Sequence, residues 1–485
     1  MTLAAPRAPH TGARPLIETR PLRHPDSRDP ALMGRRGWWL LVMNVLVPGS
    51  AQVLAGSRRL GRFGLGATLL GWLLVIVAAG LAIVAQPALI WLTTGPLSWL
   101  VLTVVQVLLI GYVLLWIVLT IDALRLVRLV KVPTITRWAA PVAAMVVLAL
   151  VSSGAVYAST VAASSRGAID AIFGSSGPSL PPSDGYYNIL LLGADSGDGR
   201  DSLRFDSISV ASINAETGAT TITGIPRELP NPPFSEGSPM LSEYPDGFRG
   251  HRDSTCGWSG WMNQIRNAAE VCREDQGTGL YPDAAAQGSA PGIEATKDAA
   301  EGVLGIEIPY YVFLDMNGFA ALIDALGGVE IEVTQRLPKG GGPGDTNQSV
   351  DEWAIGWIEP GLQRMDGDTA QWYARSRYTT NDWDRMKRQR QLQEAILAQF
   401  TPENVLSRFS AIADASAVLA DTDLPKDKLP EFFDLMLKAK KQPVTRIELT
   451  PENGVDEHEP DYDQIHEMVR TALHPPKPET EAPSE

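Results

Sequence analysis

Residues 185–475 of this 485-residue chain predict an α/β layered domain with a mixed sheet, preceded by an N-terminal multi-helix membrane region. Two observations predict this architecture. Long apolar runs with few charges fill residues 37–162, whereas the remainder has the composition of a water-soluble domain. Beyond residue 185, apolar runs of strand length alternate with segments of helical periodicity, which is typical of layered α/β domains.

Residues 1–36 are rich in proline and arginine and show no apolar periodicity. We therefore expect a disordered cytoplasmic tail. No short apolar stretch is followed here by a small-residue cleavage site, which argues against a cleaved signal peptide.

Three apolar segments, at about 64–85, 98–121 and 139–161, can each cross a hydrocarbon layer of ~30 Å, which needs about 20 residues. Residues 38–55 are shorter and contain Pro48 and Gly49. If this segment spanned, the basic loop 58–62 would lie outside, against the tendency of such loops to remain cytoplasmic. We therefore expect residues 38–55 to form a re-entrant or interfacial hairpin.

This arrangement predicts a multi-pass protein of the plasma membrane with a cytoplasmic N-terminus. The basic residues between 125 and 137 then also lie inside, and everything after residue 162 lies outside. Residues 163–184 are rich in Gly, Ser and Pro and read as a linker, and residues 476–485 as a disordered tail.

The chain has two cysteines, Cys256 and Cys272. In a cytosolic protein they would be unrelated thiols, but outside the membrane a disulfide is favoured. Closing a loop of this size would stabilise the fold by roughly 3 kcal/mol on the chain-entropy model.

Residues 187–193 (YNILLLG) form a continuous apolar run, as expected of a strand buried on both faces. The run leads to Asp195 in a Gly/Asp-rich loop. Ligands bind outside the carboxyl ends of strands in open α/β sheets, although an aspartate at this position could equally cap a turn.

Runs 207–213 and 219–225, separated by NAETG, predict a β-hairpin. In the simplest register Asp206 lies opposite Pro226, beside Arg227. Arg204, Asp206 and Arg227 would then gather at the open end of the hairpin, where a surface ion pair is the alternative interpretation. Further along, a helix over 295–304, a strand over 308–314, a helix ending at Gly327–Gly328 and a strand over 329–334 complete the α/β pattern.

The densest charge pattern lies between residues 371 and 400. Arg375 and Arg377 are two residues apart, which places them on one face of an extended segment. A helix begins near Asp382 as a plausible N-cap, and it carries Arg385, Arg388 and Gln389 on one face. Forked guanidinium donors beside a helix N-terminus suit a phosphate or pyrophosphate. Surface ion pairs of these arginines with Asp382 and Asp384 are the alternative.

Other chemistries fit less well. The acidic balance, 55 acidic against 41 basic residues, argues against a nucleic-acid partner. The six histidines avoid all the segments above, which argues against histidine-based catalysis. The GxSxG, Walker A and HExxH patterns are absent from the sequence.

Several motifs in order resemble the LytR–CpsA–Psr family of cell-wall enzymes. They are NILLLGAD, LRFDSISVASIN, IPRE, NGFAALIDALGGVEIEV, MDGDTAQWYARSR and DWDRMKRQRQ, within about residues 186–400. The resemblance implies an α/β/α layered fold with a hydrophobic pocket for a polyprenyl chain. It also implies transfer of a polyprenyl-pyrophosphate-linked glycopolymer to a peptidoglycan hydroxyl, with release of polyprenyl phosphate.

Carried over residue by residue, the resemblance implies a phosphate- and Mg²⁺-binding site. Arg204, Arg227, Arg375, Arg377, Asp382 and Arg385 would be catalytic. Arg388 and Gln389 would join these arginines in binding the pyrophosphate, and Asp195 and Asp206 would hold Mg²⁺, with Mn²⁺ as a substitute. Positioning and electrostatic stabilisation would do most of the catalysis, because negative charge develops on the phosphate oxygens. Whether a carboxylate is instead the base for the acceptor hydroxyl stays open.

The chain departs from the family's pattern at four places. Glu228 stands where Asp is common, Phe205 occupies a usually small position, the membrane region has several segments, and the insert 230–294 is long. Two rival functions also remain, a polyprenyl-phosphate-binding or envelope-regulatory protein without transfer activity, and a hydrolase of polyprenyl pyrophosphates. Hydrolysis could also accompany transfer as a side activity.

Overall fold

In a computed structural model, the chain folds into two compact units, each with most of its contacts inside itself. The helical unit comprises Met1–Leu89 and Trp99–Ala163, and the sheet unit comprises Ile90–Ser98 and Ser164–Glu485. The structure describes residues 22–475 except 24, 86–87, 89–90, 93–94, 96, 174–176, 195–203, 252–255, 257–258, 343–347, 400–403, 405–407, 409–410, 412–419 and 440–441, and no side chains over 161–173 or at 420.

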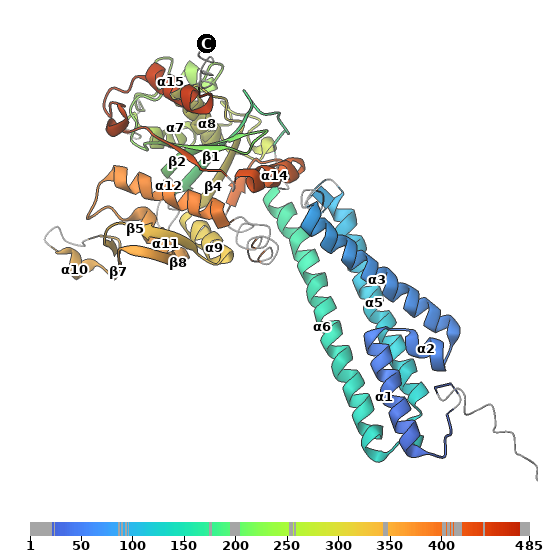
Figure 1. Cartoon of the computed structure of the whole chain (residues 1–485). Coiled ribbons are helices and arrows are strands. Elements are labelled where there is room, and N and C mark those ends of the chain that lie inside the picture. The colour runs from blue at the N-terminus through green and yellow to red at the C-terminus, as the bar shows by residue number, and fades with distance from the viewer. Residues whose placement is uncertain are drawn as a thin grey trace, which may run out of the picture. The chain divides into compact units, whose positions relative to one another are not determined.

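Apolar helices make up the helical unit (Figure 1). They are α1 (Pro30–Leu46), α2 (Ser50–Ala55), α3 (Arg58–Val84), α5 (Ser98–Val127), the 3₁₀ turn η2 (Leu129–Lys131) and α6 (Thr134–Phe173). Three stretches are long and apolar enough to cross a membrane, namely Arg58–Val84, Ser98–Lys131 and Thr134–Thr160.

The predicted boundaries at the N-terminus are wrong in one respect. Residues 30–36, assigned to a disordered tail, form the first two turns of α1. Asp29 caps this helix by accepting hydrogen bonds from the amides of Ala31 and Leu32, and Pro30 starts it. Arg36 is buried and donates to the carbonyl of Leu126 in α5 (2.8 Å). Residues 1–21 lie outside the described part.

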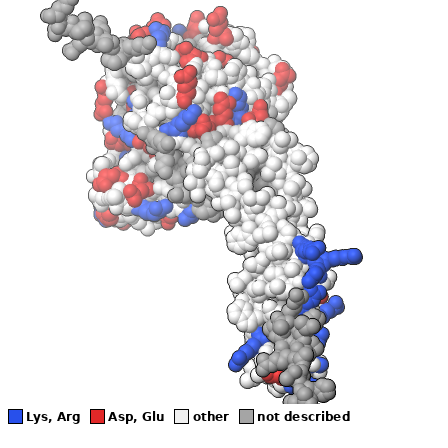
Figure 2. Space-filling view, turned by 45° about the vertical axis from the view of Figure 1, so that its right-hand side comes forward, with Lys and Arg blue, Asp and Glu red and all other residues white. Residues whose placement is uncertain are grey.

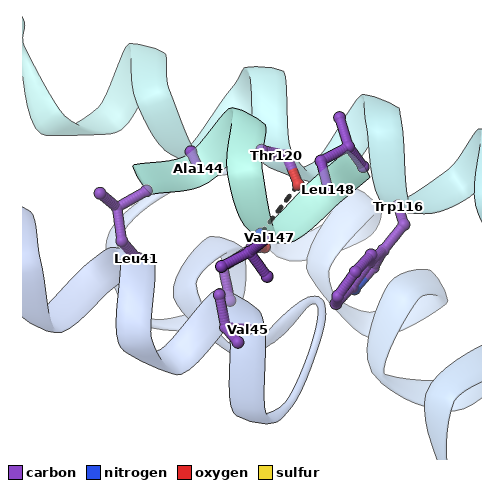
Figure 3. A pocket seen from close by; sticks show the side chains of 8 residues that line it. Leu41, Val45, Trp116, Thr120, Ala144, Val147 and Leu148 are labelled. Atoms are coloured by element: carbon purple, nitrogen blue, oxygen red, sulfur yellow. Dashed lines mark hydrogen bonds between the residues drawn. The ribbon is translucent and has the colours of Figure 1, made fainter. Parts of the chain in front are cut away.

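The segment predicted as a hairpin over 38–55 contains the end of α1, a short turn over residues 47–49, and α2. Gly49 makes the turn with a positive φ of 94°, and a Cβ there would meet the backbone nitrogen of Leu65 at 2.4 Å. Polar contacts tie the segment to α5. Asn44 donates to Thr120 (3.3 Å) beside a small pocket (Figure 3). Gln52 donates to the carbonyl of Leu119 (2.8 Å). Whether this segment is re-entrant stays a prediction.

The predicted linker 163–184 is helical in its first half, because α6 continues to Phe173. The helix continues because residues 164–173 (SSRGAIDAIF) contain no proline and are dominated by residues that helices tolerate. The first proline after the helix is Pro178.

The centre of the sheet unit is a mixed sheet of six strands in the order β10-β3-β2-β1-β4-β9. The strands are β1 (Tyr186–Ala194), β2 (Phe205–Asn214), β3 (Thr220–Ile225), β4 (Tyr310–Asp315), β9 (Ala420–Thr422) and β10 (Thr445–Glu448). Two small antiparallel sheets accompany it, β5 (Val329–Val333) with β8 (Gly361–Met365), and β6 (Leu337–Lys339) with β7 (Gly356–Ile358). Parallel pairs β1–β4 and β3–β10 beside antiparallel neighbours confirm the mixed sheet.

Helices cover both faces of the central sheet (Figure 1). One apolar core joins the sheet to α7 (Ile265–Ala269), α8 (Pro291–Leu304) and α15 (Tyr462–Leu473). Across the sheet, Tyr187 and Tyr310 pack against α14 (Leu429–Ala439). A separate core joins β5 and β8 to α9 (Met316–Leu326), α11 (Gly367–Arg375) and α12 (Asp382–Gln399). The short helix α10 (Val350–Trp353) and the 3₁₀ turns η3 (Pro239–Ser242), η5 (Met262–Gln264), η6 (Ala285–Gln287), η7 (Lys426–Lys428) and η8 (Pro451–Asn453) complete the unit.

The elements expected between residues 295 and 334 are found with small shifts. The helix expected over 295–304 starts earlier, at Pro291, and ends before Gly305 as predicted. On β5, Val329, Ile331 and Val333 are buried and alternate with exposed glutamates. These elements confirm the predicted layered α/β fold.

Candidate functional site

Four charged side chains from β2, from the segment after β3 and from the start of α12 meet at the end of the β2–β3 hairpin. Nη1 of Arg227 donates to Oδ1 of Asp206 at 2.6 Å. Nη2 of Arg227 lies 3.9 Å from Oδ1 of Asp382, and Nη2 of Arg385 lies 3.0 Å from Oδ2 of the same aspartate. Arg227 also pairs with Glu228, at 2.9 Å. The order is therefore Asp206, Arg227, Asp382, Arg385, with alternating charges.

The hairpin brings Asp206 and Arg227 together, but in a register different from the predicted one. Ile208 pairs with Ile225, where the simplest register would pair Ser207 with Ile225. The turn causes the shift, because Gly218, with a φ of 72°, donates to the carbonyl of Asn214 and closes a loop of Ala215 to Gly218. Continued past the last pair, this register brings Arg227 opposite Asp206.

The start of α12 supplies Asp382 and Arg385. The prediction that Asp382 caps the helix is wrong by one residue. The side-chain oxygen of Asn381 accepts the amide of Asp384 at 2.8 Å, which makes Asn381 the capping residue and leaves Asp382 in the first turn. Asp382 is therefore available for the two arginines, and it also lies where a helix favours negative charge.

Burial and neighbouring charges shift the pKa values of both arginines. Burial lowers the pKa of Arg227, but its hydrogen bond to Asp206 and the charges of Asp206, Asp382 and Glu228 outweigh this and raise it. Burial and the charge of Arg227 lower the pKa of Arg385, with Arg377 adding to the effect. Since Asp382 does not fully compensate, another anion would stabilise the charged form of Arg385.

Unused hydrogen-bonding groups point to the same conclusion. Nε of Arg227, Nε of Arg385 and Oδ1 of Asp382 are buried without a hydrogen-bond partner in the part of the chain that the structure describes. Buried donors and acceptors of this kind are costly when unpaired. Two guanidinium donors beside a helix N-terminus form a site that a phosphate oxygen would complete.

The arginine pair 375 and 377 is arranged differently from the prediction. Arg375 is the last residue of α11. The prediction that Arg375 and Arg377 lie on one face of an extended segment is therefore wrong, because only Arg377 follows the end of the helix. The helix ends there because Ser376 leaves helical geometry. The guanidinium of Arg375 lies 5.4 Å from the ring of Trp372. Arg377 is exposed and close enough to Arg385 to influence its charge.

Arg388 and Gln389 point to backbone carbonyls at the end of α11. Arg388 donates to the carbonyl oxygens of Tyr373, at 2.9 Å, and Ser376, and Gln389 donates to that of Ala374. These contacts satisfy carbonyls that a helix end leaves without partners. In this structure the two side chains hold the Arg375–Arg377 segment against α12, and their binding of pyrophosphate stays a prediction.

Two of the predicted positions are not joined to the cluster by any contact among the described residues. Asp195 lies outside the described residues, next to the end of β1 at Ala194. Arg204 is exposed immediately before β2. The described residues contain one group of three metal-ligand side chains within 4.8 Å of one another, His251 with Cys256 and Cys272, and it does not include Asp206.

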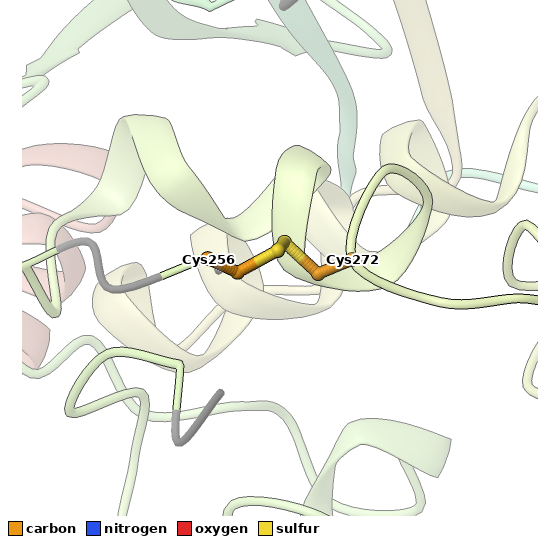
Figure 4. Close-up of a disulfide and its surroundings, with 2 residues drawn as sticks. All are labelled: Cys256 and Cys272. Atoms are coloured by element: carbon orange, nitrogen blue, oxygen red, sulfur yellow. A yellow bond between two sulfur atoms is a disulfide. The ribbon is translucent and has the colours of Figure 1, made fainter. Parts of the chain in front are cut away.

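As expected, the structure pairs Cys256 with Cys272 in a disulfide, with their Cα atoms 6.1 Å apart (Figure 4). The loop that the disulfide closes reaches the arginine site. The amide of Asn263 donates to the carbonyl of Arg227 at 2.9 Å, and that of Met262 donates to Leu229. The disulfide-bonded insert therefore lies directly beside the charged cluster.

Sequence reasoning did not assign a role to Glu228 or Asn381. Glu228 stood out only as a departure from a family pattern, yet it pairs with Arg227. The preference of Asn for N-cap positions could have identified Asn381.

The sequence of the chain is also similar to those of known proteins. Residues 262–472 match the model of the LytR_cpsA_psr family. A polyisoprenyl-teichoic acid–peptidoglycan teichoic acid transferase, TagU of Halalkalibacterium halodurans, is 33% identical over 163 residues, which is 33% of this chain and 49% of that protein. The cell wall biosynthesis protein LcpA of Corynebacterium glutamicum is 26% identical over 315 residues, 61% of this chain and 58% of that protein.

Among solved structures, TagV of B. subtilis aligns with a TM-score of 0.39 at 18% identity, covering 59% of this chain and 97% of that one. The chain spans about half the length of the first curated relatives that it matches, 49% and 50%.

Proposed function

The chain belongs to the LytR–CpsA–Psr family through residues 262–472, and on that premise we propose that it is a membrane-anchored glycopolymer–peptidoglycan phosphotransferase. Its donor would be a glycan linked to a polyprenyl pyrophosphate, and its acceptor a hydroxyl of peptidoglycan. The observation that carries the proposal is the cluster of Arg227 and Arg385 around Asp382, with unpaired buried donors on both arginines.

The reaction exchanges one phosphorus–oxygen bond for another. The acceptor oxygen bonds to the phosphorus that carries the glycan, and the bond from that phosphorus to the bridging oxygen breaks. The products are a phosphodiester and polyprenyl phosphate, and the hydroxyl proton passes to the leaving phosphate or to water. Charge grows on the bridging and non-bridging oxygens, so Arg227 and Arg385 act by stabilising it, which for such donors is worth about 10²–10³ in rate.

Mg²⁺ is part of the proposal, and the residues fit it in outline. Carboxylate oxygens are the ligands that Mg²⁺ prefers, and it commonly uses one or two of them together with substrate phosphates. Asp206 is half-exposed and uses Oδ1 for Arg227, which leaves Oδ2 for an ion. Asp206 would therefore hold the ion, joined by Asp195, and a bound ion would neutralise charge on the pyrophosphate.

The polyprenyl chain needs an apolar surface near this site. On β4, which is not an edge strand, Val312, Phe313 and Leu314 are only half-buried, and Phe319 of α9 is likewise half-buried. Half-buried apolar side chains inside a layered domain are where a lipid would gain most from contact. We assign the lipid to this region.

We also propose that the sheet unit lies outside the cell. Basic side chains gather at one end of the helical unit, and the rest of its visible surface is nearly uncharged (Figure 2). The helical unit has basic residues at the start of α3 and from the end of α5 to the start of α6, namely Arg58, Arg59, Arg62, Arg125, Arg128, Lys131 and Arg137. Basic loops of this kind stay cytoplasmic, which directs the C-terminal end of α6 outward.

The test uses the full chain in lipid nanodiscs with a polyprenyl-pyrophosphate oligosaccharide, Mg²⁺ and peptidoglycan fragments. We expect a glycan–peptidoglycan product that is lost in Arg385→Ala and kept in Arg336→Ala. Arg336 is an exposed arginine that stacks on Trp357, so it controls for loss of charge alone. Bound lipid without any product would favour a binding protein, and release of polyprenyl phosphate and free glycan phosphate without a peptidoglycan product would favour a hydrolase. Either result would overturn the proposal.

A further inference from the structure

An exposed tryptophan stands beside the arginine site on the disulfide-bonded insert. Trp261 is 37% exposed, and it pairs with Pro230 in an isolated antiparallel bridge. Two residues later, Asn263 donates its amide to the carbonyl of Arg227. Two residues span at most about 7 Å of chain, so Trp261 lies close to the residue that contacts Arg227.

The backbone around Trp261 is held from several sides. The amide of Asn231 donates to the carbonyl of Gly260 at 2.8 Å, and the hydroxyl of Tyr462 in α15 donates to the carbonyl of Pro230 at 2.6 Å. A Cβ on Gly260 would meet the backbone of Arg249 at 2.6 Å, so these segments are in close contact. The disulfide of Cys256 closes the loop that contains Trp261. The indole is therefore presented from a fixed segment.

In both chain stretches, 228–229 and 261–262, one residue is exposed and its neighbour is buried. Leu229 and Met262 are 2% and 0% exposed and belong to the main core. Glu228 and Trp261 are exposed instead, and the Glu228 side chain is 50% exposed while it pairs with Arg227. The indole of Trp261 and the carboxylate of Glu228 are therefore the exposed groups of two stretches that are hydrogen-bonded to each other.

A second observation points to a ligand. Asn263 is only 5% exposed, yet its side-chain oxygen has no hydrogen-bond partner among the described residues. A buried polar atom without a partner costs free energy, which a bound hydroxyl would recover. Asn263 is the residue whose amide joins the insert to Arg227.

We propose that Trp261, with Asn263 and Glu228, forms a saccharide subsite next to the phosphate-binding arginines. Sugar rings expose C–H faces that pack on an indole, and their hydroxyls bond to amides and carboxylates. The inference rests on the proposed function for the kind of sugar, since both the donor glycan and the acceptor peptidoglycan carry sugars next to the reacting phosphate. Trp261 determines which glycan the site accepts.

The test measures binding directly, by calorimetry on the full chain in nanodiscs. The probes are a soluble peptidoglycan tetrasaccharide, and a polyprenyl pyrophosphate with and without its sugars. We expect Trp261→Ala to weaken saccharide binding at least tenfold, with Trp261→Phe retaining most of it. Val271→Ala is the control, because Val271 is also exposed, at 51%, and lies in the same disulfide loop.

The arms of the experiment separate the two sugar sources and the two proposals. Weakened binding of the tetrasaccharide alone assigns the subsite to the acceptor, and weakened binding of only the sugar-bearing lipid assigns it to the donor. Equal affinities of wild type, Trp261→Ala and Val271→Ala for all probes, with unchanged thermal midpoints, would overturn the subsite. Saccharide binding that depends on Trp261 without any transfer product would leave the subsite standing and the transferase proposal refuted.

Discussion

Arg227 donates a hydrogen bond of 2.6 Å to Asp206, although 21 residues separate them along the chain. The β2–β3 hairpin brings the two together at its open end, because its register, continued past the last pair, places Asp206 opposite Arg227. Arg227 thus connects Asp206 to Asp382 and, through it, to Arg385. The first two predictions each change one residue of this connection, and the third concerns the ion that Asp206 would hold.

Asp206→Asn should lower kcat/KM for transfer by about 10²-fold or more, because Arg227 loses the carboxylate that orients it and the site loses a charged oxygen ligand. The measurement is a steady-state transfer assay on the full chain. Asp351→Asn, an exposed acid in α10, is the control. Activity of Asp206→Asn equal to that of the control would remove Asp206 from the site.

Replacing Arg385 by Lys should reduce kcat almost as strongly as replacing it by Ala. A lysine keeps the charge but has neither the planar fork nor the reach to use both Asp382 and a phosphate oxygen. Single-turnover kinetics with saturating donor lipid would measure the loss. Near-complete rescue by lysine would mean that charge alone, rather than forked hydrogen bonding, is needed at this position.

Chelation should abolish transfer, and Mg²⁺ should restore it. In Asp206→Asn the Mg²⁺ concentration that gives half-maximal activity should rise, since one ligand of the ion is neutralised. Titration of Mg²⁺ after treatment with EDTA measures this concentration for wild type and variant. Full activity of the chelated enzyme would exclude the metal from the mechanism.

Loss of the disulfide should destabilise the sheet unit by about 3 kcal/mol, the chain-entropy value for a loop of this size. The double variant Cys256→Ser, Cys272→Ser should unfold at lower denaturant concentration than wild type. It should also bind saccharide more weakly, because the loop carrying Trp261 gains freedom. Unchanged unfolding midpoints under oxidising and reducing conditions would contradict this.

A buried carboxylate away from the site should make stability depend on pH. Asp423 lies 3.0 Å from Lys297, which also pairs with Glu294, and burial raises the pKa of Asp423 to about 6. Unfolded aspartate titrates near pH 4, so the folded chain holds this proton more tightly. The resulting stability is fully present below about pH 4 and is lost as the pH rises through about 6.

Asp423→Asn should remove this dependence. The free energy of unfolding of wild type relative to the variant should fall by at most about 3 kcal/mol between pH 4 and pH 7. Denaturation at a series of pH values gives this difference, with the exposed Asp427→Asn as the control. A difference that stays constant, or grows with pH, would refute the assignment.

The sequence alone determined the local elements and which residue types could meet. The apolar run at 187–193 forms β1, the turn before Gly218 forms a hairpin, and Gly305 ends α8. These features depend on short-range patterns of burial and backbone conformation, which the chain encodes within a few residues. The same patterns placed Asp206 near Arg227.

Tertiary packing alone decided the exact partners. α11 continues through Arg375 because it packs against α9 and α12, whereas the one-residue shift of the hairpin arises from its own local turn. Arg388 turned to the carbonyls of that helix end. The approach of Trp261 to Arg227 depends on contacts across a long insert, whose free energies arise only once distant segments pack together. Local patterns carry no record of such contacts.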